Sequence, residues 1–523
     1  MRLLTAALTT LMLAIAAPVA AQDWWEAETA HFIVKSRDSR SATQEFAETM
    51  ERFDRGLRFL NNLPEDHVEQ SRANKPVIYR FGDYVDMSRM YGNSEAGVAG
   101  FFISRAGASV AFAPARRQRS NNSRERRDRT QSIEQVLLHE YTHYFMMMNY
   151  PAAYPRWYSE GYAEMVSTMR FDDDGSFHIG DPPQSRGQMI FMMPASRLDQ
   201  MLDAERKLTG YDAYQHYVTG WLFTHYMSFD PAREAKLREF LVALGNGEDS
   251  LTAAERLFGD LDDIQRDLVS YKSGPFPGYD VRPNVTDTPQ VTVRKIEGAE
   301  RALIDEEMRL KRGVSRESAR SIAENLRREV AGFPESAHAY ALLAEAEFDS
   351  REYERAASAA ARAVELDADN VDAWIIRARA AMKLAESDPA RFDEARDFLA
   401  EARAVDMADP RPLIAYYMSF YESGDVSDIP EQAIIALEQA YDEAGDDAEY
   451  RLILGRQLLI ESRFDDARTV MLPALYGGHR VESDEDDAFT PDRLFAAIDA
   501  RDRDQALQLI NKVFDDAEED DEG

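Results

Sequence analysis

Hydrophobic and polar positions follow two different patterns along this chain. In the first half, the short apolar runs 31–35 and 76–81 have the length and composition of β-strands, and the stretch 42–63 between them has the spacing of an amphipathic helix. Helical spacing returns at 132–149 and again over 233–271. Strands and helices in this order predict an α+β domain.

The second half is dominated by alanine-rich helical segments that recur with a period near 34 residues. This period and the spacing of the small residues resemble tetratricopeptide repeats, in which paired helices pack closely and each pair buries its face against the next. The clearest copy begins at Leu454, and others begin at Tyr340 and Trp374. An all-α, tetratricopeptide-like helical repeat domain is therefore expected, with an irregular alanine-rich helical bundle as the alternative.

Glycine and proline interrupt both patterns in the segment 274–296, so we predict a linker there. The α+β domain is then expected to span residues 22–273 and the helical repeats residues 297–480. Residues 481–523 are expected to form a C-terminal helix followed by an acidic, solvated tail.

Residues 1–21 have the composition of a signal peptide. Arg2 supplies the positive start, residues 3–17 an apolar run, and residues 19–21 a small-residue cleavage site. We therefore expect an exported protein, either periplasmic or secreted, whose mature chain begins near Gln22. No later stretch approaches the roughly 20 apolar residues of a transmembrane segment.

Composition restricts the chemistry further. The chain has no cysteine, so any metal site must use His, Asp and Glu ligands, which suits zinc. The formal net charge of −34 makes nucleic acid an unfavourable partner, because such binding depends on Lys and Arg at the phosphates. Seven arginines between Arg116 and Arg129 form a basic cluster, which is either a solvated loop or a contact for an anionic partner.

The sequence His-Glu-x-x-His occurs within the predicted helix 132–149. His139 and His143 are four residues apart, so they project from the same helix face and can bind one ion. Glu140 can reach a water on that ion and act as a general base. Because the chain has only nine histidines, a chance occurrence has a probability on the order of one in a hundred. The motif therefore predicts one Zn²⁺ per chain.

A third metal ligand is expected at Glu160, which begins a second predicted helix seventeen residues after His143. An antiparallel return of the chain would bring its carboxylate to the metal, and three protein ligands would leave a fourth position for water, as in catalytic zinc sites. Glu164, one turn later, is positioned to accept the free ring N–H of a ligand histidine. The alternative for Glu164 is an exposed helix carboxylate.

These residues resemble the gluzincin metallopeptidases, the thermolysin-like group with two His ligands and a Glu ligand on the next helix. The form Trp-x-x-Glu-Gly-x-Ala-Glu at 157–164 is similar to a branch found in exported bacterial proteins. Trp24, His31-Phe32 and the segment 217–221 also match that branch, and the resemblance covers residues 24–272. It implies a zincin-like α+β fold and the hydrolysis of peptide bonds.

The resemblance implies two further features of the site. In gluzincins a Tyr or His on a later helix donates a hydrogen bond to the oxyanion, a role that falls by position on Tyr217 first and His225 second. Both residues also fit a plain packing stripe at helical spacing. An edge strand before the metal-binding helix binds extended peptide in this family, and residues 108–114 are the candidate.

A peptide or protein substrate is thus expected, with the helical repeats binding substrate or a protein partner. Endopeptidase activity is preferred over aminopeptidase activity, because no segment resembles those that recognise a free amine. The alternative from a different class is a catalytically inactive, repeat-based protein-binding scaffold.

Overall fold

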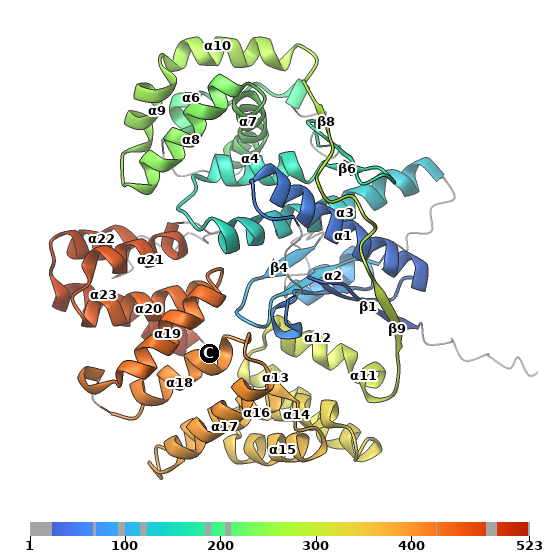
Figure 1. Cartoon of the computed structure of the whole chain (residues 1–523), viewed down its shortest axis with the longest axis vertical. Helices are drawn as coiled ribbons and strands as arrows, with labels where there is room; N and C mark the ends of the chain where they lie inside the picture. The colour runs from blue at the N-terminus through green and yellow to red at the C-terminus, as the bar shows by residue number, and fades with distance from the viewer. Residues whose placement is uncertain are drawn as a thin grey trace, which may run out of the picture.

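The structure is a computed structural model that describes residues 23–65, 70–92, 100–115, 123–183, 190–203, 211–424, 426–476 and 489–520. An N-terminal α+β region is followed by a long all-helical region (Figure 1). This confirms the predicted order of the two regions. The predicted signal peptide and the side chains of the arginine cluster lie outside the described part of the chain. No helix among the described residues is long and apolar enough to cross a membrane.

A six-stranded sheet lies within the α+β region. Its strands, in their order across the sheet, are β4 (Phe101–Ile103), β5 (Val110–Ala113), β3 (Val77–Arg80), β2 (Ile33–Ser36), β1 (Trp24–Glu28) and β9 (Thr292–Ile296). The three strands β2, β3 and β5 are parallel, whereas β4, β1 and β9 run antiparallel to their neighbours. A smaller sheet contains β6 (Arg170–Phe171), β7 (Phe177–Ile179) and β8 (Tyr279–Val281).

Nine helices of the α+β region surround these strands in the described part of the chain. They are α1 (Arg40–Leu60), α2 (Tyr84–Tyr91), α3 (Ser123–Asn149), α4 (Arg156–Val166), α6 (Leu198–Met201), α7 (Tyr211–Ser228), α8 (Pro231–Gly245), α9 (Ser250–Phe258) and α10 (Leu261–Lys272). A short 3-10 helix covers Arg72–Asn74. The helix α3 ends at the residue predicted from the sequence but begins earlier.

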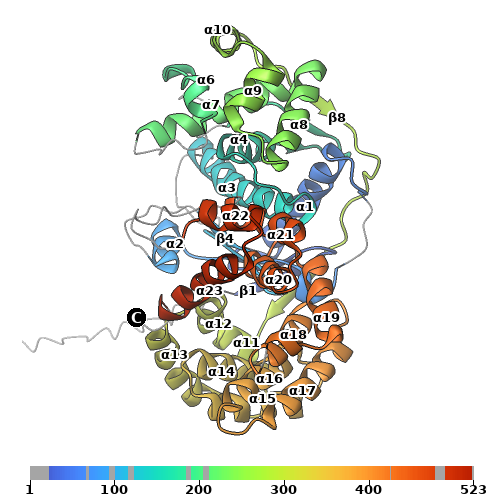
Figure 2. The ribbon, with the colours of Figure 1, turned by 90° about the vertical axis from the view of Figure 1, so that its left-hand side faces the viewer.

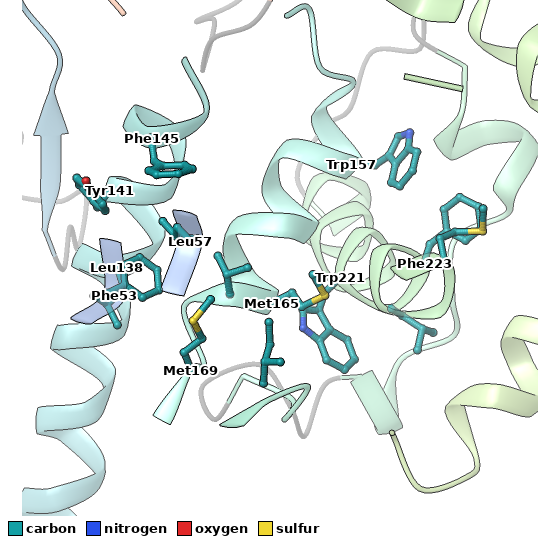
Figure 3. Close-up of a cluster of buried hydrophobic side chains, with 14 of the residues drawn as sticks. Phe53, Leu57, Leu138, Tyr141, Phe145, Trp157, Met165, Met169, Trp221 and Phe223 are labelled. Carbon is teal, nitrogen blue, oxygen red and sulfur yellow. The ribbon is translucent and has the colours of Figure 1, made fainter. Parts of the chain in front are cut away.

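Helices α1, α3, α4 and α7 share one hydrophobic core (Figure 3). In α1 the buried residues Phe46, Met50, Phe53 and Leu57 recur every three or four positions, so they form one stripe that faces this core. Burying each such side chain stabilises the fold by about 1.5–3 kcal/mol. The core thereby fixes α3 and α4, the two helices that carry the predicted metal ligands.

Two glycines allow α4 and α7 to approach closely. A Cβ atom on Gly161 of α4 would lie 2.5 Å from the carbonyl oxygen of Gly220, and one on Gly220 of α7 would lie 2.7 Å from the carbonyl oxygen of Trp157. Real Cβ atoms do not come this close to backbone oxygens, because close-packed interiors leave no room for the overlap. The position of α4 therefore depends on both glycines.

The helical region contains thirteen α-helices among the described residues. They are α11 (Gly298–Ala302), α12 (Ile304–Arg312), α13 (Arg316–Glu329), α14 (Ala337–Asp349), α15 (Tyr353–Leu366), α16 (Val371–Leu384), α17 (Arg391–Val405), α18 (Arg411–Tyr421), α19 (Glu431–Glu443), α20 (Ala448–Ile460), α21 (Phe464–Tyr476), α22 (Pro491–Asp499) and α23 (Arg503–Asp520). From α13 onward each helix packs on the next along the chain, and Figure 2 shows that they follow an arc.

The segment 274–296 is not simply the linker that its glycines and prolines predicted. Two short strands lie within it: β8 pairs with β7, and β9 pairs with β1 over five residues, from Trp24 opposite Ile296 to Glu28 opposite Thr292. The chain therefore completes both sheets before it enters the helical region. Local composition did not predict these strands, because the prolines that lie just outside them are typical of irregular structure.

We predict that Gly161→Ala destabilises the protein by about 3 kcal/mol, because the new methyl group forces α4 and α7 apart. Thermal or urea unfolding followed by circular dichroism measures this change. Gly245→Ala is the matched control: Gly245 also lies in a helix, but a Cβ atom there meets nothing within 4 Å. The free energy of unfolding of the control should be unchanged or raised by up to about 1 kcal/mol. Equal effects of the two substitutions would contradict the close-approach argument.

Candidate metal centre

The predicted ligands come together from two helices. His139 and His143 lie on α3, and Glu160 lies on α4. The opposite face of α3 is held by the core, where Tyr141 is buried and its hydroxyl donates a hydrogen bond to Asp54 Oδ1 of α1 at 2.7 Å. Tyr141, which lies between the two histidines in the sequence, thus fixes the rotation of α3 about its own axis.

Three ligand atoms converge at one point. His139 Nε2 lies 3.2 Å from His143 Nε2 and 3.2 Å from Glu160 Oε2, and the distance from His143 Nε2 to Glu160 Oε2 is 3.7 Å. A tetrahedral zinc ion with bonds of about 2.0–2.1 Å has ligand atoms roughly 3.3 Å apart. The observed distances fit that ion closely. Among the described residues this is the one group of three or more His, Asp and Glu side chains with such convergence.

Both histidines turn Nε2 toward this point, so their Nδ1 atoms face other partners. His143 Nδ1 lies 3.1 Å from the Ser159 hydroxyl. His139 Nδ1 lies 3.7 Å from Glu164 Oε1, so Glu164 is beside the predicted ligand but beyond hydrogen-bond distance. Sequence reasoning missed Ser159. The requirement that each ligand histidine bind a second group would have indicated this neighbour of Glu160.

The electrostatics of the centre favour a cation. Glu160 is only 2% exposed. Burial alone would raise its pKa, but hydrogen bonds and charge interactions with His139 and His143 hold that pKa well below its usual range. For His139, burial would lower the pKa, but the hydrogen bond and charge of Glu160, together with the charges of Glu164 and Glu140, raise it above its usual value. A buried carboxylate that stays ionised supplies the negative charge that a divalent ion requires.

Glu140 lies next to His139 on α3 and is half-buried. Its negative charge acts on the His139 imidazole. Within the described part of the chain, its carboxylate forms no hydrogen bond or ion pair. An uncommitted carboxylate beside a metal ligand has the chemistry of a general base.

Tyr217 lies beside the first turn of α4. Its hydroxyl accepts a hydrogen bond from Arg156 Nη2 at 3.2 Å, and the Arg156 guanidinium lies 5.5 Å from the centre of its ring. Arg156 is the first residue of α4, one turn before Glu160. Arg156 is the donor in this bond, and the phenol oxygen of Tyr217 is the acceptor.

The structure does not support His225 as an oxyanion donor. Its side chain is fully buried, with Nδ1 at 2.8 Å from the Tyr271 hydroxyl and Nε2 at 3.0 Å from the Gly180 carbonyl oxygen. Its ring stacks on Phe229 with a centroid distance of 4.0 Å. Both ring nitrogens are therefore engaged within an aromatic cluster, and the residue serves core packing.

The edge strand was also predicted at the wrong place. Residues 108–114 contain β5, which lies between β3 and β4 and is not an edge. The outermost strands of the sheet are β4 and β9, and next to β5 the edge strand is β4, which has no strand on its outer side among the described residues. Phe102 of β4 packs against Tyr144 of α3 with ring centroids 5.1 Å apart. The strand β4 therefore lies against the helix that carries the two histidines.

Comparison with known proteins adds no family assignment. No protein-family model matches the chain, and no curated protein matches it either. The geometry of His139, His143 and Glu160, with the groups beside them, therefore indicates a metal centre.

We predict that Ser159→Ala weakens zinc binding by about tenfold, because the His143 ring loses the group that orients it. Competition with a chromogenic chelator measures the affinity. Ser167→Ala is the matched control, since the Ser167 hydroxyl donates to the Glu164 carbonyl oxygen at the end of the same helix and does not contact either histidine among the described residues. An affinity for Ser159→Ala equal to that of the control would show that the Ser159 contact is unimportant.

A second prediction concerns pH. Burial lowers the pKa of His225 to about 4, whereas an unfolded histidine titrates near 6.5. Between these values the unfolded chain binds the extra proton, so the stabilising contribution of neutral His225 is complete above about pH 6.5 and falls as the pH approaches 4. The loss amounts to about 3 kcal/mol at pH 4.

The test compares His225→Phe with the wild type in urea unfolding at several pH values. Phenylalanine keeps a ring on Phe229 and cannot titrate. The free energy of unfolding of the wild type should fall relative to that of His225→Phe as the pH falls from 6.5 to 4. A constant difference would mean that His225 does not titrate in this range.

Proposed function

We propose that this chain is an exported zinc-dependent metallopeptidase of the gluzincin type, with a zincin-like catalytic domain and tetratricopeptide-like helices. One observation carries the proposal: His139 Nε2, His143 Nε2 and Glu160 Oε2 converge at distances that suit one tetrahedral zinc ion. These three residues would hold the ion and leave one position for water. A three-ligand set of this kind is typical of catalytic rather than structural zinc.

A bound zinc ion would polarise the carbonyl oxygen of the peptide bond and lower the pKa of a bound water. Glu140 accepts the proton of the attacking water at its carboxylate and then donates it to the departing amine nitrogen. Ser159, whose hydroxyl lies 3.1 Å from His143 Nδ1, keeps that imidazole oriented. Glu164 lies 3.7 Å from His139 Nδ1, and its negative charge favours an N–H on that side of the ring.

Tyr217 is proposed to donate its hydroxyl hydrogen to the oxyanion of the tetrahedral intermediate, with Arg156 holding the phenol oxygen from the other side. The donated hydrogen would stabilise charge that develops only in the transition state, which is the condition for lowering the barrier.

An extended peptide substrate is proposed to add to the free edge of β4 through main-chain hydrogen bonds. A cavity of about 430 Å³ lies along β4, between that strand and the residues just after α12. Strand addition does not require a free amino terminus, so we propose endopeptidase rather than aminopeptidase activity.

The first experiment measures the metal content of the purified protein by elemental analysis. We expect about one zinc per chain in the wild type and its loss in His143→Ala and Glu160→Ala, because each variant leaves two ligands. No bound zinc after incubation with the metal would contradict the proposal and favour the catalytically inactive scaffold.

Glu140→Gln separates chemistry from binding. Glutamine has the same size but cannot accept the proton, so the variant should keep its zinc and lose activity on a peptide substrate by about 10²–10⁴-fold. Glu134→Gln, one and a half turns earlier on α3, serves as the control for a charge lost from the same helix. Full activity of Glu140→Gln would exclude the proposed mechanism.

A further inference from the structure

The turn between β4 and β5, residues 104–109, extends from the sheet into the helical region. It forms one side of a cavity of about 890 Å³, and the other walls come mainly from α14, α16, α18 and α20. These helices form part of the arc in Figure 2, and Figure 1 shows β4 directed from the sheet toward them. The helical region therefore contacts the strand that borders the candidate metal centre.

Two residues of this turn bind to the segment just before α20. The Ser104 hydroxyl donates a hydrogen bond to Asp446, and the backbone N–H of Ala106 donates to Asp447 Oδ2 at 2.8 Å. Asp446 and Asp447 are both buried. Hydrogen bonds to charged acceptors are stronger than those between neutral groups, so these contacts hold the turn firmly.

Arg105 binds the opposite side of the cavity. Its guanidinium donates to the carbonyl oxygens of Lys311 and Arg312 at 3.0 and 3.3 Å. These are the last two residues of α12, whose carbonyl groups have no partner within the helix. A cation at this end also interacts favourably with the helix dipole. Arg105 thus caps α12 and links it to β4.

The turn fits this place sterically as well. Ala106 is buried within the core of the C-terminal helices. Gly107 has a φ of +61°, and a Cβ atom on it would lie 2.9 Å from Asp409 and 2.8 Å from Arg411. A side chain at this position would be strained by the backbone and would clash with both neighbours.

The same contacts extend to the metal-binding helix. Phe102 of β4 packs on Tyr144, the residue after His143. Tyr144 and Asp446 line the same cavity of about 250 Å³, together with Ser109 of the turn. Asp446, which binds the turn through Ser104, therefore also lies near α3.

The helical region also contacts the α+β region at points outside this turn. Glu307 of α12 accepts hydrogen bonds from Lys35 Nζ at 2.5 Å and from the Tyr79 hydroxyl at 2.6 Å. At another point Asn74 Nδ2 donates to the Ala408 carbonyl oxygen at 2.7 Å. Loss of the turn contacts should therefore leave the two regions joined.

We propose that the helical region positions edge strand β4 beside the candidate metal centre through the 104–109 turn, with Arg105 as a positioning residue. The kinetic part of this inference rests on the proposed peptidase function, whereas the structural part does not. A peptide added to β4 would bind to a backbone whose far end is held by α12 and by Asp446 and Asp447. Weakening that hold should impair substrate binding and spare the metal ligands.

The test uses Arg105→Gln in the full-length chain. Hydrogen exchange of residues 100–113, measured by mass spectrometry, should become about tenfold faster, because two hydrogen bonds from a charged donor are lost. KM for a peptide substrate should rise by about fivefold or more, with kcat and zinc content unchanged. Arg256→Gln is the matched control, since Arg256 donates two hydrogen bonds to Glu248 on the surface near α9.

Ser104→Ala repeats the test with a smaller change, since it removes one hydroxyl group. Exchange rates of residues 100–113 that stay within about twofold of the wild type in both variants would overturn the proposal. A fall in kcat or in zinc content at unchanged KM would also overturn it, because the effect would then lie at the metal centre. If the wild type cleaves no peptide, the proposed function fails, and the exchange rates still decide whether Arg105 holds β4.

Discussion

The candidate site depends on burying one carboxylate. An ionised Glu160 that is 2% exposed would be costly without compensation, by several kcal/mol. His139 and His143 compensate its charge in the absence of metal, as the lowered pKa of Glu160 and the raised pKa of His139 indicate. This arrangement requires α3 and α4 to lie at a fixed separation. The glycines at the α4–α7 crossing and the Tyr141–Asp54 hydrogen bond provide it from two directions.

The residues of the centre divide into those that a local motif predicts and those that only the fold brings near. His139, His143 and Glu160 follow from helical spacing and one antiparallel return, and the structure brings all three together. Tyr217 and His225 lie on the same helix at a spacing that fits either packing or function. Sequence periodicity cannot separate these roles, because a buried histidine and a catalytic one obey the same 3.6-residue repeat.

The order of the strands could not be read from the sequence for a related reason. β4 has only three residues, and its apolar content does not distinguish it from β5. Their places follow from long-range pairing, which local composition does not record. The same holds for β9, whose partner β1 lies at the other end of the α+β region. The helical region was easier to predict because its contacts are mostly between consecutive helices.

The two regions depend on each other physically. Without α12, the Lys35 ammonium and the Tyr79 hydroxyl would lose Glu307, the buried acceptor that they share. Conversely, a fragment that begins after β9 would expose Ile304 and Met308 of α12, which are each only 1% exposed and pack in one cluster with Trp24 and Tyr79 of the sheet. Exposing a buried side chain of this size costs about 1.5–3 kcal/mol, so the two together are a large share of the stability of an ordinary domain. The helical region is therefore better regarded as part of the wall around the candidate site than as an independent module attached to it.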